Sequence, residues 1–308
     1  MNGHIPVLAR AVLDGLRIRE DGTYVDGTVG GGGHASLIAE MLTGGRLIAM
    51  DRDPESVARA QARLARFPGV TLLHRNYGEL AQVLRELGIG LVDGVLIDAG
   101  LSSIQLDDPR RGFTFQEEGP LDMRMDTSQG LTAAQYLSHV REDELAETLR
   151  SYGDVGPARR IARAIVKRSK SGAMKTTGDL AGAVSEALDF VHGMPEETRT
   201  VFQAVRIAVN EEYSWLEAGL RQAIAALAPG GRLAVIAFHS GEDRIAKRVL
   251  QDVSRPKEIR WPDGRVRERL APVARVLTPK PVQPDAEEIR FNPRAHSARL
   301  RIGERLEG

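Results

Sequence analysis

Two acidic residues and a run of glycines have types and spacing suited to binding a nucleoside. Glycines 30–33 follow the apolar run "TYVDGTV" and precede the helix-like segment "HASLIAEML". Such a turn directs backbone N–H groups and a helix N-terminus at a ligand, so we expect an anionic or carboxylate-bearing ligand there. Asp51 follows Gly32 by 19 residues. An acid at this place can accept hydrogen bonds from both hydroxyls of a ribose.

The glycine spacing fits two cofactors equally well. Gly30, Gly32 and Ala35 satisfy a loose dinucleotide fingerprint. Asp26, Gly30 and Gly32 equally suit the first motif of enzymes that use S-adenosylmethionine. NAD and S-adenosylmethionine therefore both remain open on spacing alone.

Further polar residues follow two other strand-like runs. Asp98 ends "VDGVLID" and is followed by Ser102 and Ser103, and His239 ends "RLAVIAFH". The carboxyl ends of parallel strands line the ligand crevice of an open α/β sheet. We therefore expect Asp98 and the serines near a reacting centre, whereas His239 either faces the substrate or is structural. The chain has no cysteine, which excludes disulfides, thiolate zinc sites and a Cys nucleophile, and no metal site is expected.

The elements that must position these residues alternate between strand and helix. Strands are expected at 23–29, 45–51, 70–75, 92–98 and 232–239, and helices at 34–42, 53–67, 78–87, 200–227 and 241–252. Asp53 is predicted to cap the second helix, with Pro54 in its first turn. Closing strands are expected at 274–278 and 297–305. This alternation predicts an α/β fold, a mostly parallel sheet with helices on both faces.

The alternation is interrupted between residues 104 and 198. A Gly/Pro/charge-rich loop at 107–126 is followed by four predicted helices at 132–139, 142–152, 158–170 and 176–191. We predict a discontinuous core domain, 1–103 and 199–308, that contains a mostly helical insertion, 104–198. Residues 253–270 are expected to form a mobile basic loop.

The distribution of charged and apolar residues indicates which partners and which cellular location to expect. Lys+Arg and Asp+Glu both number 42, but residues 244–308 carry 16 basic and 9 acidic residues. This asymmetry is compatible with a nucleic-acid surface or with an ordinary solvated face. No signal peptide and no run of about 18 apolar residues is present, so we expect a cytoplasmic protein without a membrane span.

Several long segments together resemble one known family. They are "HIPVL", "VDGTVGGGGHA", "DRDP", "SSIQLDDPRRGFTFQEEGPLDMRMD", "ARRIARAIV", "TRTVFQAVRIAVNEE", "LAPGGRLAVIAFHSGEDRIAKR", "LTPKPVQPDAEE" and "NPRAHSARLR". The chain resembles the bacterial MraW-type (RsmH-type) methyltransferases, which make N4-methylcytidine in the decoding region of small-subunit (16S) ribosomal RNA. The resemblance covers essentially the whole chain.

The resemblance implies a class I (Rossmann-like) methyltransferase fold with an inserted helical domain and S-adenosyl-L-methionine as cofactor. It places the cofactor contacts on Gly32, Gly33, His34, Asp51, Tyr77, Asp98 and Gln105. Tyr77 replaces the usual Phe and keeps an aromatic ring for adenine. The chain departs from the family pattern at Ala99, Ala237 and Gly241, and in "YGDVG" and "MPEETR".

A cytosine N4 amine is a poor nucleophile and must be held in line with the sulfonium methyl group. Asp98, Ser102 and Ser103 are candidates to accept its hydrogens. The target base must leave its stack, and basic groups must hold the RNA backbone. The candidates are Arg110, Arg111, Arg124, Arg159, Arg160, Arg163 and Arg294.

The expected partner is the ribosomal RNA of the small subunit, bound when the subunit is assembled. A homodimer of the protein itself stays open. Two other functions stay open as well. The first is an NAD-dependent oxidoreductase, and the second is a non-catalytic RNA-binding or ribosome-assembly protein that keeps the fold.

Overall fold

The computed structural model describes residues 6–188 and 193–307, which divide into two compact units. The first unit comprises Met1–Gly100 and Tyr213–Gly308, and the second comprises Leu101–Glu212. The second boundary lies later in the chain than residue 198, where we predicted it. The reason is that helix α10 (Glu197–Asn210) contributes Val201, Phe202 and Val205 to the core of the second unit.

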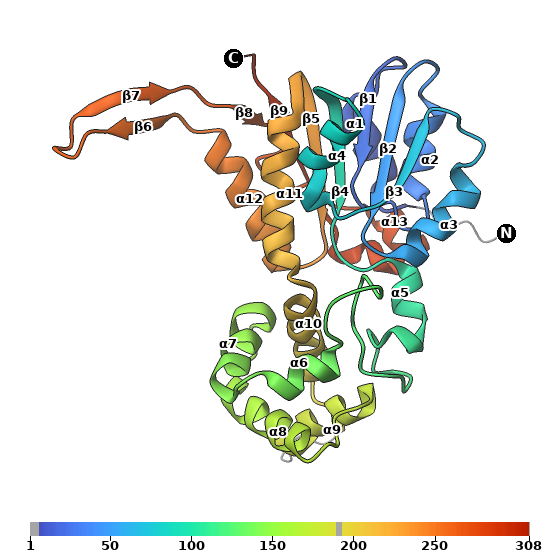
Figure 1. Ribbon diagram of the computed structural model, residues 1–308, viewed down its shortest axis with the longest axis vertical. Helices are drawn as coiled ribbons and strands as arrows, with labels where there is room; N and C mark the ends of the chain where they lie inside the picture. The colour runs from blue at the N-terminus through green and yellow to red at the C-terminus, as the bar shows by residue number, and fades with distance from the viewer. Residues whose placement is uncertain (1–5, 189–192, 308) are drawn as a thin grey trace. The chain divides into compact units, whose positions relative to one another are not determined.

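The first unit is built on a seven-stranded sheet in the order β3-β2-β1-β4-β5-β9-β8 (Figure 1). Strands β1 to β5 are parallel, and β9 runs antiparallel to both β5 and β8. The strands are β1 (Thr23–Asp26), β2 (Arg46–Asp51), β3 (Val70–His74), β4 (Val92–Asp98), β5 (Leu227–Ala237), β8 (Ala274–Val276) and β9 (Arg299–Arg305). The predicted α/β fold class is confirmed.

Helices cover both faces of this sheet. Alternate residues of β2 point to opposite faces: Leu47 and Ala49 to one, and Ile48 and Met50 to the other. All four are buried, as expected for a parallel strand covered on both sides. Helices α1 (Ala9–Leu16), α2 (Gly33–Glu40) and α3 (Pro54–Leu64) pack on the first face, and α4 (Leu80–Glu86), α11 (Glu212–Ala226) and α12 (Ser240–Val253) on the second.

Two predicted elements differ in detail. The helix expected at 200–227 is two helices, because Glu211 adopts φ 49° and ends α10 before α11 begins. The strand predicted at 232–239 begins earlier, because the "PGG" segment before it lies within β5. Gly230 has φ 78° there, and the pairing of β5 with β4 shifts register between Val92 and Gly94. The left-handed backbone at Gly230 and the register shift therefore lie within β5 and do not end it.

The segment predicted to be a mobile loop at 253–270 forms a two-stranded antiparallel hairpin of β6 (Lys257–Arg260) and β7 (Val266–Leu270). The remaining short elements of this unit are the 3₁₀ helix η1 (Tyr77–Glu79), helix α13 (Ala286–Phe291) and the 3₁₀ helix η3 (Pro293–Ser297).

The second unit is helical and has its own core. It consists of α5 (Ser103–Asp107), η2 (Pro109–Arg111), α6 (Ala133–His139), α7 (Glu142–Gly153), α8 (Ala158–Lys170), α9 (Thr177–Ala187) and α10. The four predicted helices correspond to α6 to α9, although residues 189–191 of the last lie outside the described part. Helix α8 buries Ile161, Ala162 and Ile165 and exposes Arg159, Arg160 and Arg163, which is the pattern of an amphipathic helix.

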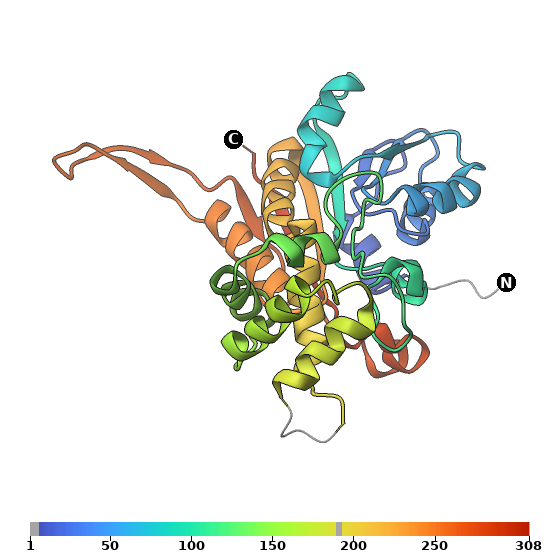
Figure 2. The same ribbon diagram turned by 60° about the horizontal axis from the view of Figure 1, so that its bottom comes forward.

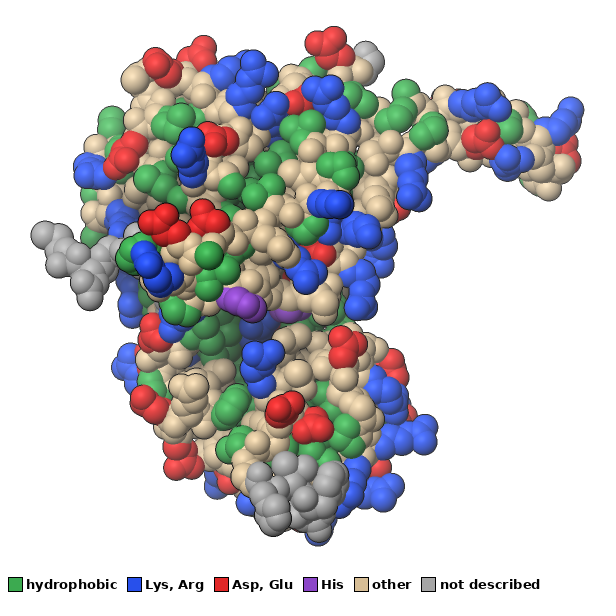
Figure 3. Space-filling model, turned by 180° about the vertical axis from the view of Figure 1, so that it is seen from behind, with side chains coloured by type: hydrophobic (Ala, Val, Ile, Leu, Met, Phe, Trp, Pro, Cys, Tyr) green, Lys and Arg blue, Asp and Glu red, His purple; other side chains and the backbone are tan. Residues whose placement is uncertain are grey.

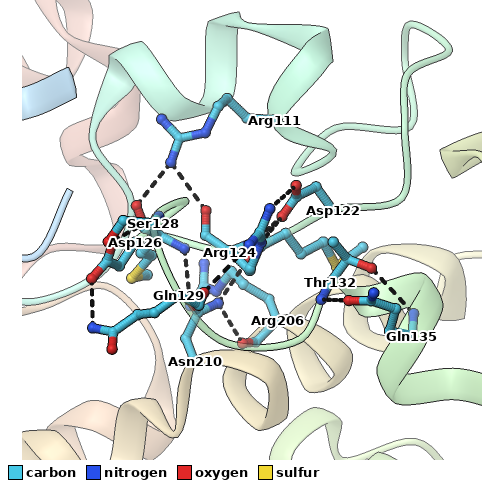
Figure 4. A network of polar contacts seen from close by, with 12 residues as sticks. Arg111, Asp122, Arg124, Asp126, Ser128, Gln129, Thr132, Gln135, Arg206 and Asn210 are labelled. Carbon is cyan, nitrogen blue, oxygen red and sulfur yellow. Dashed lines mark hydrogen bonds and ion pairs between the residues drawn. The ribbon is translucent and has the colours of Figure 1, made fainter. Parts of the chain in front are cut away.

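The long loop before α6 is ordered by polar contacts with α10 (Figure 4). Asn210 on α10 donates to the carbonyl of Met123 at 2.7 Å and accepts from the N–H of Met125 at 2.7 Å. Both methionines are buried. Phe115 of the "FTF" segment meets Phe202 edge to face, with ring centroids 5.1 Å apart. The loop is therefore part of the core of the second unit.

Candidate active site

The glycine turn after β1 is held by its neighbours in the sheet. The N–H of Val29 donates to Met50 O at 2.8 Å, and the N–H of Gly30 donates to Oδ2 of Asp51 at 2.8 Å. Gly32 adopts φ 79° at the N-cap of α2, a conformation that favours glycine, and no side chain caps this helix. Gly32 itself has no side chain to accept from the first N–H groups of α2, which suits a helix start that receives an anionic group.

Three aspartates end three adjacent strands beside this turn. Asp26, Asp51 and Asp98 are the last residues of β1, β2 and β4, and the sheet order is β2-β1-β4. Thr28 links two of them, because its N–H donates to Oδ1 of Asp26 at 3.1 Å and its hydroxyl accepts from the N–H of Asp98 at 2.7 Å. The parallel register therefore gathers three carboxylates at one edge of the sheet.

Burial raises the pKa of all three carboxyl groups and so disfavours their simultaneous ionisation. It raises the pKa of Asp26 to about 7, although the Thr28 N–H opposes the shift. It raises the pKa of Asp51 to about 6 against two backbone hydrogen bonds. The pKa of Asp98 is raised well above its ordinary value, first by burial and then by the charges of Asp26 and Glu242. A cationic ligand group would relieve this repulsion.

Asp26 and Asp98 each keep one buried carboxylate oxygen without a partner among the described residues. These atoms are Oδ2 of Asp26 and Oδ1 of Asp98. A buried acceptor that lacks a donor is destabilising by about 1–3 kcal/mol, and such atoms occur where a ligand completes the site. Asp98 was expected near the reacting centre, whereas Asp26 was named only within the glycine motif. Its place in the "VDG" segment at the end of the first strand was the available signal.

His34 lies between the N-terminal segment and Asp98. Its side chain is buried, with Nε2 2.9 Å from Val7 O and Nδ1 3.6 Å from Oδ2 of Asp98. Since a carbonyl only accepts, Nε2 carries a proton, and a proton shared by Nδ1 and Asp98 is required for attraction between them. The predicted contact of His34 with the cofactor stays a prediction.

Tyr77 lies beside the turn, in η1. Its ring packs in the same apolar cluster as α11, and a Cβ atom added at Gly219 would overlap the ring. A Cβ added at Gly27 would lie 2.9 Å from Cβ of Tyr77. Both glycines therefore provide space for this aromatic residue next to the glycine turn, and its contact with adenine stays a prediction.

His239 is the N-cap residue of α12. Its Nε2 lies 3.1 Å from Oε1 of Glu242, and Oε2 of Glu242 accepts from the N–H of Phe238 at 2.7 Å. The side chain of Glu242 is 3% exposed, and its charge reaches Asp98. Glu242 was not predicted from the sequence, although a Glu three residues after a cap is the pattern of a capping box. A role of His239 toward substrate stays a prediction.

Comparison with known proteins identifies the family. The family model described as "MraW methylase family" matches residues 1–306. The chain belongs to the MraW methylase family. It is 45% identical to "Ribosomal RNA small subunit methyltransferase H" of Heliobacterium modesticaldum, over 98% of each chain. Proteins of the same name from Nitrosococcus oceani (99% of this chain, 98% of the relative) and Sorangium cellulosum (99% and 91%) are 44% and 46% identical.

Membership of the MraW methylase family confirms the predicted family, the methyltransferase class and S-adenosylmethionine as cofactor. It does not favour the NAD-dependent oxidoreductase or the non-catalytic RNA-binding protein. Among the described residues, no group of three or more His, Cys, Asp or Glu side chains could hold a metal ion. No helix within 6–188 or 193–307 is long and apolar enough to cross a membrane.

Ser102 and Gln105, at the start of the second unit, form a reciprocal cap of helix α5. The N–H of Ser102 donates to Oε1 of Gln105 at 3.0 Å, and the N–H of Gln105 donates to Oγ of Ser102 at 3.3 Å. This cap fixes the start of α5. The predicted roles of both residues stay predictions. The side chain of Ser103 is outside the described part of the structure.

The arginines predicted to hold RNA fall into three groups. Arg159, Arg160 and Arg163 are exposed on α8. The first two line, with Arg150, Gly156 and Pro157, a depression of about 550 Å³. Arg110 and Arg294 are also exposed, and Arg110 pairs with Asp108 at 2.7 Å, which holds the pKa of that carboxyl at about 2.

The third group is engaged inside the loop (Figure 4). Arg124 pairs through two nitrogens with Asp122, at 2.8 and 2.9 Å. Arg111 is 4% exposed and donates to the carbonyls of Arg124 and Met125 at 3.0 and 2.9 Å. Burial of this guanidinium is at odds with the predicted RNA contact, because a side chain that holds the loop from inside is out of reach of a phosphate.

Three of the departures from the MraW pattern lie at packed positions. Ala99 and Ala237 are 5% and 1% exposed and lie in the core. A Cβ atom at Gly241 would overlap the hydroxyl oxygen of Tyr213 on α11 and lie 3.2 Å from Nδ1 of His239. Gly241 therefore provides the space that Tyr213 occupies, and the two rings of Tyr213 and His239 lie with centroids 5.9 Å apart.

Gly241→Ala is expected to destabilise the protein by about 1–3 kcal/mol, because the added methyl group overpacks the site against Tyr213. In a Tyr213→Ala background the clash is absent, and the same change should stabilise α12 by about 0.5–1 kcal/mol through helix propensity. The measurement is urea unfolding of the four proteins of this cycle. An equal effect of Gly241→Ala in both backgrounds would contradict the explanation.

Proposed function

We propose that this chain transfers the methyl group of S-adenosylmethionine to the N4 amine of a cytidine in the decoding region of small-subunit ribosomal RNA. The observation that carries the proposal is Oδ1 of Asp98 at the end of β4, which is buried and has no partner among the described residues, beside the glycine turn. The relatives' name, ribosomal RNA small subunit methyltransferase, supports the substrate class.

The donor groups of the first unit suit S-adenosylmethionine. The uncapped start of α2, at Gly32 and Gly33, suits the cofactor's carboxylate. The three strand-end carboxylates suit its ammonium and sulfonium charges, whereas the pyrophosphate of NAD would be repelled. Asp51 would hold the ribose hydroxyls and Tyr77 would pack on adenine. The bound cofactor supplies an electrophilic methyl group.

This chain's own residues would do the remaining work. The N4 lone pair is delocalised into the cytosine ring, so the enzyme must hold the amine in line with the methyl group. A carboxylate oxygen that accepts an N4 hydrogen increases electron density on nitrogen and can receive the proton that leaves after transfer. Oδ1 of Asp98 has the free lone pairs for this, and the raised pKa of Asp98 makes it a stronger proton acceptor than an ordinary carboxylate.

Asp98 has one alternative partner, the amino group of the cofactor itself. The two assignments differ in what the residue affects: a contact to the cofactor governs its binding, and a contact to the N4 amine governs turnover. His34 is assigned to holding Asp98 in place through its 3.6 Å contact.

RNA would be held by exposed arginines of the second unit, chiefly Arg159, Arg160 and Arg163 on α8. All three are exposed, and Arg163 also pairs with Glu142 at 3.3 Å. Lys and Arg that neutralise phosphates make RNA affinity fall steeply with salt. We infer that the substrate is the assembled small ribosomal subunit in the cytoplasm. Whether the enzyme is a monomer or a homodimer stays open.

The proposal is tested with labelled S-adenosylmethionine, purified protein and small ribosomal subunits that lack the modification. Nuclease digestion of the RNA followed by chromatography should yield labelled N4-methylcytidine. Cofactor binding without this product would refute the target. Absence of cofactor binding would refute the assignment of the glycine turn and its three carboxylates.

A further inference from the structure

The hairpin of β6 and β7 forms no sheet with the rest of the first unit. Its strands, Lys257–Arg260 and Val266–Leu270, pair only with each other, and every residue in them is exposed. In both ribbon views the hairpin extends away from the seven-stranded sheet (Figures 1 and 2). An isolated two-stranded hairpin is at best marginally stable in water. We therefore expect such an arm to be stabilised by a binding partner.

Large apolar side chains are exposed along this arm. Ile259, Val266 and Leu270 are 39–40% exposed, and Trp261 is 48% exposed. Isolated exposed apolar residues are ordinary, but four within one small hairpin form a continuous candidate contact surface.

The arm also carries excess positive charge. Residues 255–270 hold six basic side chains, Arg255, Lys257, Arg260, Arg265, Arg267 and Arg269, and three acidic ones, Glu258, Asp263 and Glu268. Blue basic side chains are spread along the extended arm, with hydrophobic ones between them (Figure 3).

The acids compensate only some of this charge. Glu258 pairs with Arg260 and Arg269, at 2.5 and 3.3 Å, and Asp263 pairs with Arg265 at 2.8 Å. Arg255 and Lys257 have no ion-pair partner among the described residues. The arm therefore presents uncompensated cations at the base of its first strand, a charge complementary to phosphate.

Trp261 and Arg267 form a cation–π pair at the far end of the arm. The guanidinium carbon of Arg267 lies 4.9 Å from the centroid of the Trp261 ring. The turn that follows is closed by the N–H of Gly264, which donates to Trp261 O at 2.9 Å. Aromatic rings and arginine planes are the surfaces on which unstacked RNA bases stack.

We propose that the β6–β7 arm binds an unpaired segment of the RNA substrate, with a base stacked on the Trp261–Arg267 pair and the backbone held by Arg255 and Lys257. The choice of RNA rests on the proposed function. A second copy of the chain fits less well, because two arms of net charge +3 would repel each other.

The test measures binding separately from chemistry. The probe is a transcript of the small-subunit decoding region, titrated by filter binding, together with kcat and KM on unmodified subunits. Trp261→Ala should raise the dissociation constant and KM by about 5- to 150-fold, the range for loss of one base–aromatic stack. Cofactor affinity and melting temperature should not change, since the ring is solvent-exposed. Trp261→Phe should restore most of the affinity.

The matched control is Phe291→Ala. Phe291 is 68% exposed and has Arg290 at 4.9 Å from its ring centroid, so the pair is similar but lies on α13. It should leave RNA affinity unchanged. Arg255→Ala with Lys257→Ala should lower the slope of log affinity against log salt by about 1 to 2.

Unchanged RNA affinity in Trp261→Ala would overturn the proposal, even with full methyl transfer in the wild type. A wild-type dimer that becomes monomeric in Trp261→Ala would also overturn it, in favour of contact between copies. Trp261-dependent RNA binding without any methyl transfer would uphold the arm and refute the proposed reaction.

Discussion

Asp98→Asn is expected to lower kcat for methyl transfer by about 100-fold or more, with the fold intact. Asn preserves the shape of the side chain but cannot receive a proton, and general-base assistance contributes typically about 10²–10⁴-fold. The N–H of residue 98 would still donate to Thr28, so the end of β4 should keep its position. Single-turnover rates with saturating cofactor measure the effect directly.

Asp93→Asn is the matched control for this change. Asp93 lies on the same strand, β4, where it accepts from the N–H of Thr23 at 2.8 Å and pairs with Arg19. It is near the amino end of the strand, so its loss should affect stability slightly and kcat by less than about twofold. Equal losses of kcat in both variants would show that the effect of Asp98→Asn is structural.

The same pair of variants separates the two partners of Asp98. Calorimetric titration with S-adenosylmethionine should give an unchanged dissociation constant in Asp98→Asn if the carboxylate serves the N4 amine. A loss of cofactor affinity, with normal turnover at saturation, would assign Asp98 to the cofactor instead.

The pH dependence of kcat/KM provides a further test of Asp98. Burial, Asp26 and Glu242 raise the pKa of Asp98 well above its usual value, and the ionised form is the one that accepts a proton. Activity should therefore rise with pH through that raised pKa, and the acidic limb should lie at higher pH than for an ordinary carboxylate. This limb should be absent in Asp98→Asn.

The sheet and the place of the site followed from the sequence because their causes are local or periodic. Buried parallel strands are short apolar runs between helices, and an acid at the end of each run must lie at the ligand edge of the sheet. This reasoning placed Asp51 and Asp98 correctly relative to the glycine turn. Asp26 satisfied the same rule, but its burial between two other acids depends on strand order, which one sequence does not give.

Contacts distant in the sequence explain what was not predicted. Arginine is a residue type that usually lies at the surface, so the sequence did not indicate that Arg111 is buried. Only the fold of the loop around it turns its guanidinium toward two carbonyls. Helices α10 and α11 form one continuous helical pattern, and the left-handed backbone at Glu211 that separates them has no glycine to mark it. Gly241 departs from the family pattern, and its cause is Tyr213, 28 residues earlier.

Arg301→Met is expected to lower the free energy of unfolding by about 3–5 kcal/mol, the range for breaking a buried ion pair from one side. Arg301 on β9 is 5% exposed, and Asp243 on α12 is 8% exposed. Two nitrogens of Arg301 donate to the carboxylate at 2.6 and 3.0 Å. Met fills much of the same volume, so the main loss is the counter-charge of Asp243. Chemical unfolding at pH 7 measures it.

The chain supplies a control that shares the same acid. Arg299 reaches Asp243 from the same strand at 3.4 Å, but its side chain is 43% exposed. Solvent screens such a pair, so Arg299→Met should be destabilising by no more than about 1 kcal/mol. Arg301→Met combined with Asp243→Leu removes both charges and should recover most of the loss. A double variant as unstable as Arg301→Met alone would indicate a packing defect.

The pH dependence of stability distinguishes charge from packing in the same variant. Burial alone would raise the pKa of Asp243, but hydrogen bonds and charge from Arg301 outweigh it, so the pKa lies below 3.8. The wild type thus keeps this stabilisation above pH 3.8 and loses it as pH falls through the lower, folded-state pKa. Without Arg301, burial should raise the pKa of Asp243. The difference in unfolding free energy between the two proteins should then be largest near pH 7 and shrink as the buried carboxyl takes up a proton. A difference that is independent of pH would mean that lost packing, rather than an uncompensated charge between α12 and β9, causes the instability.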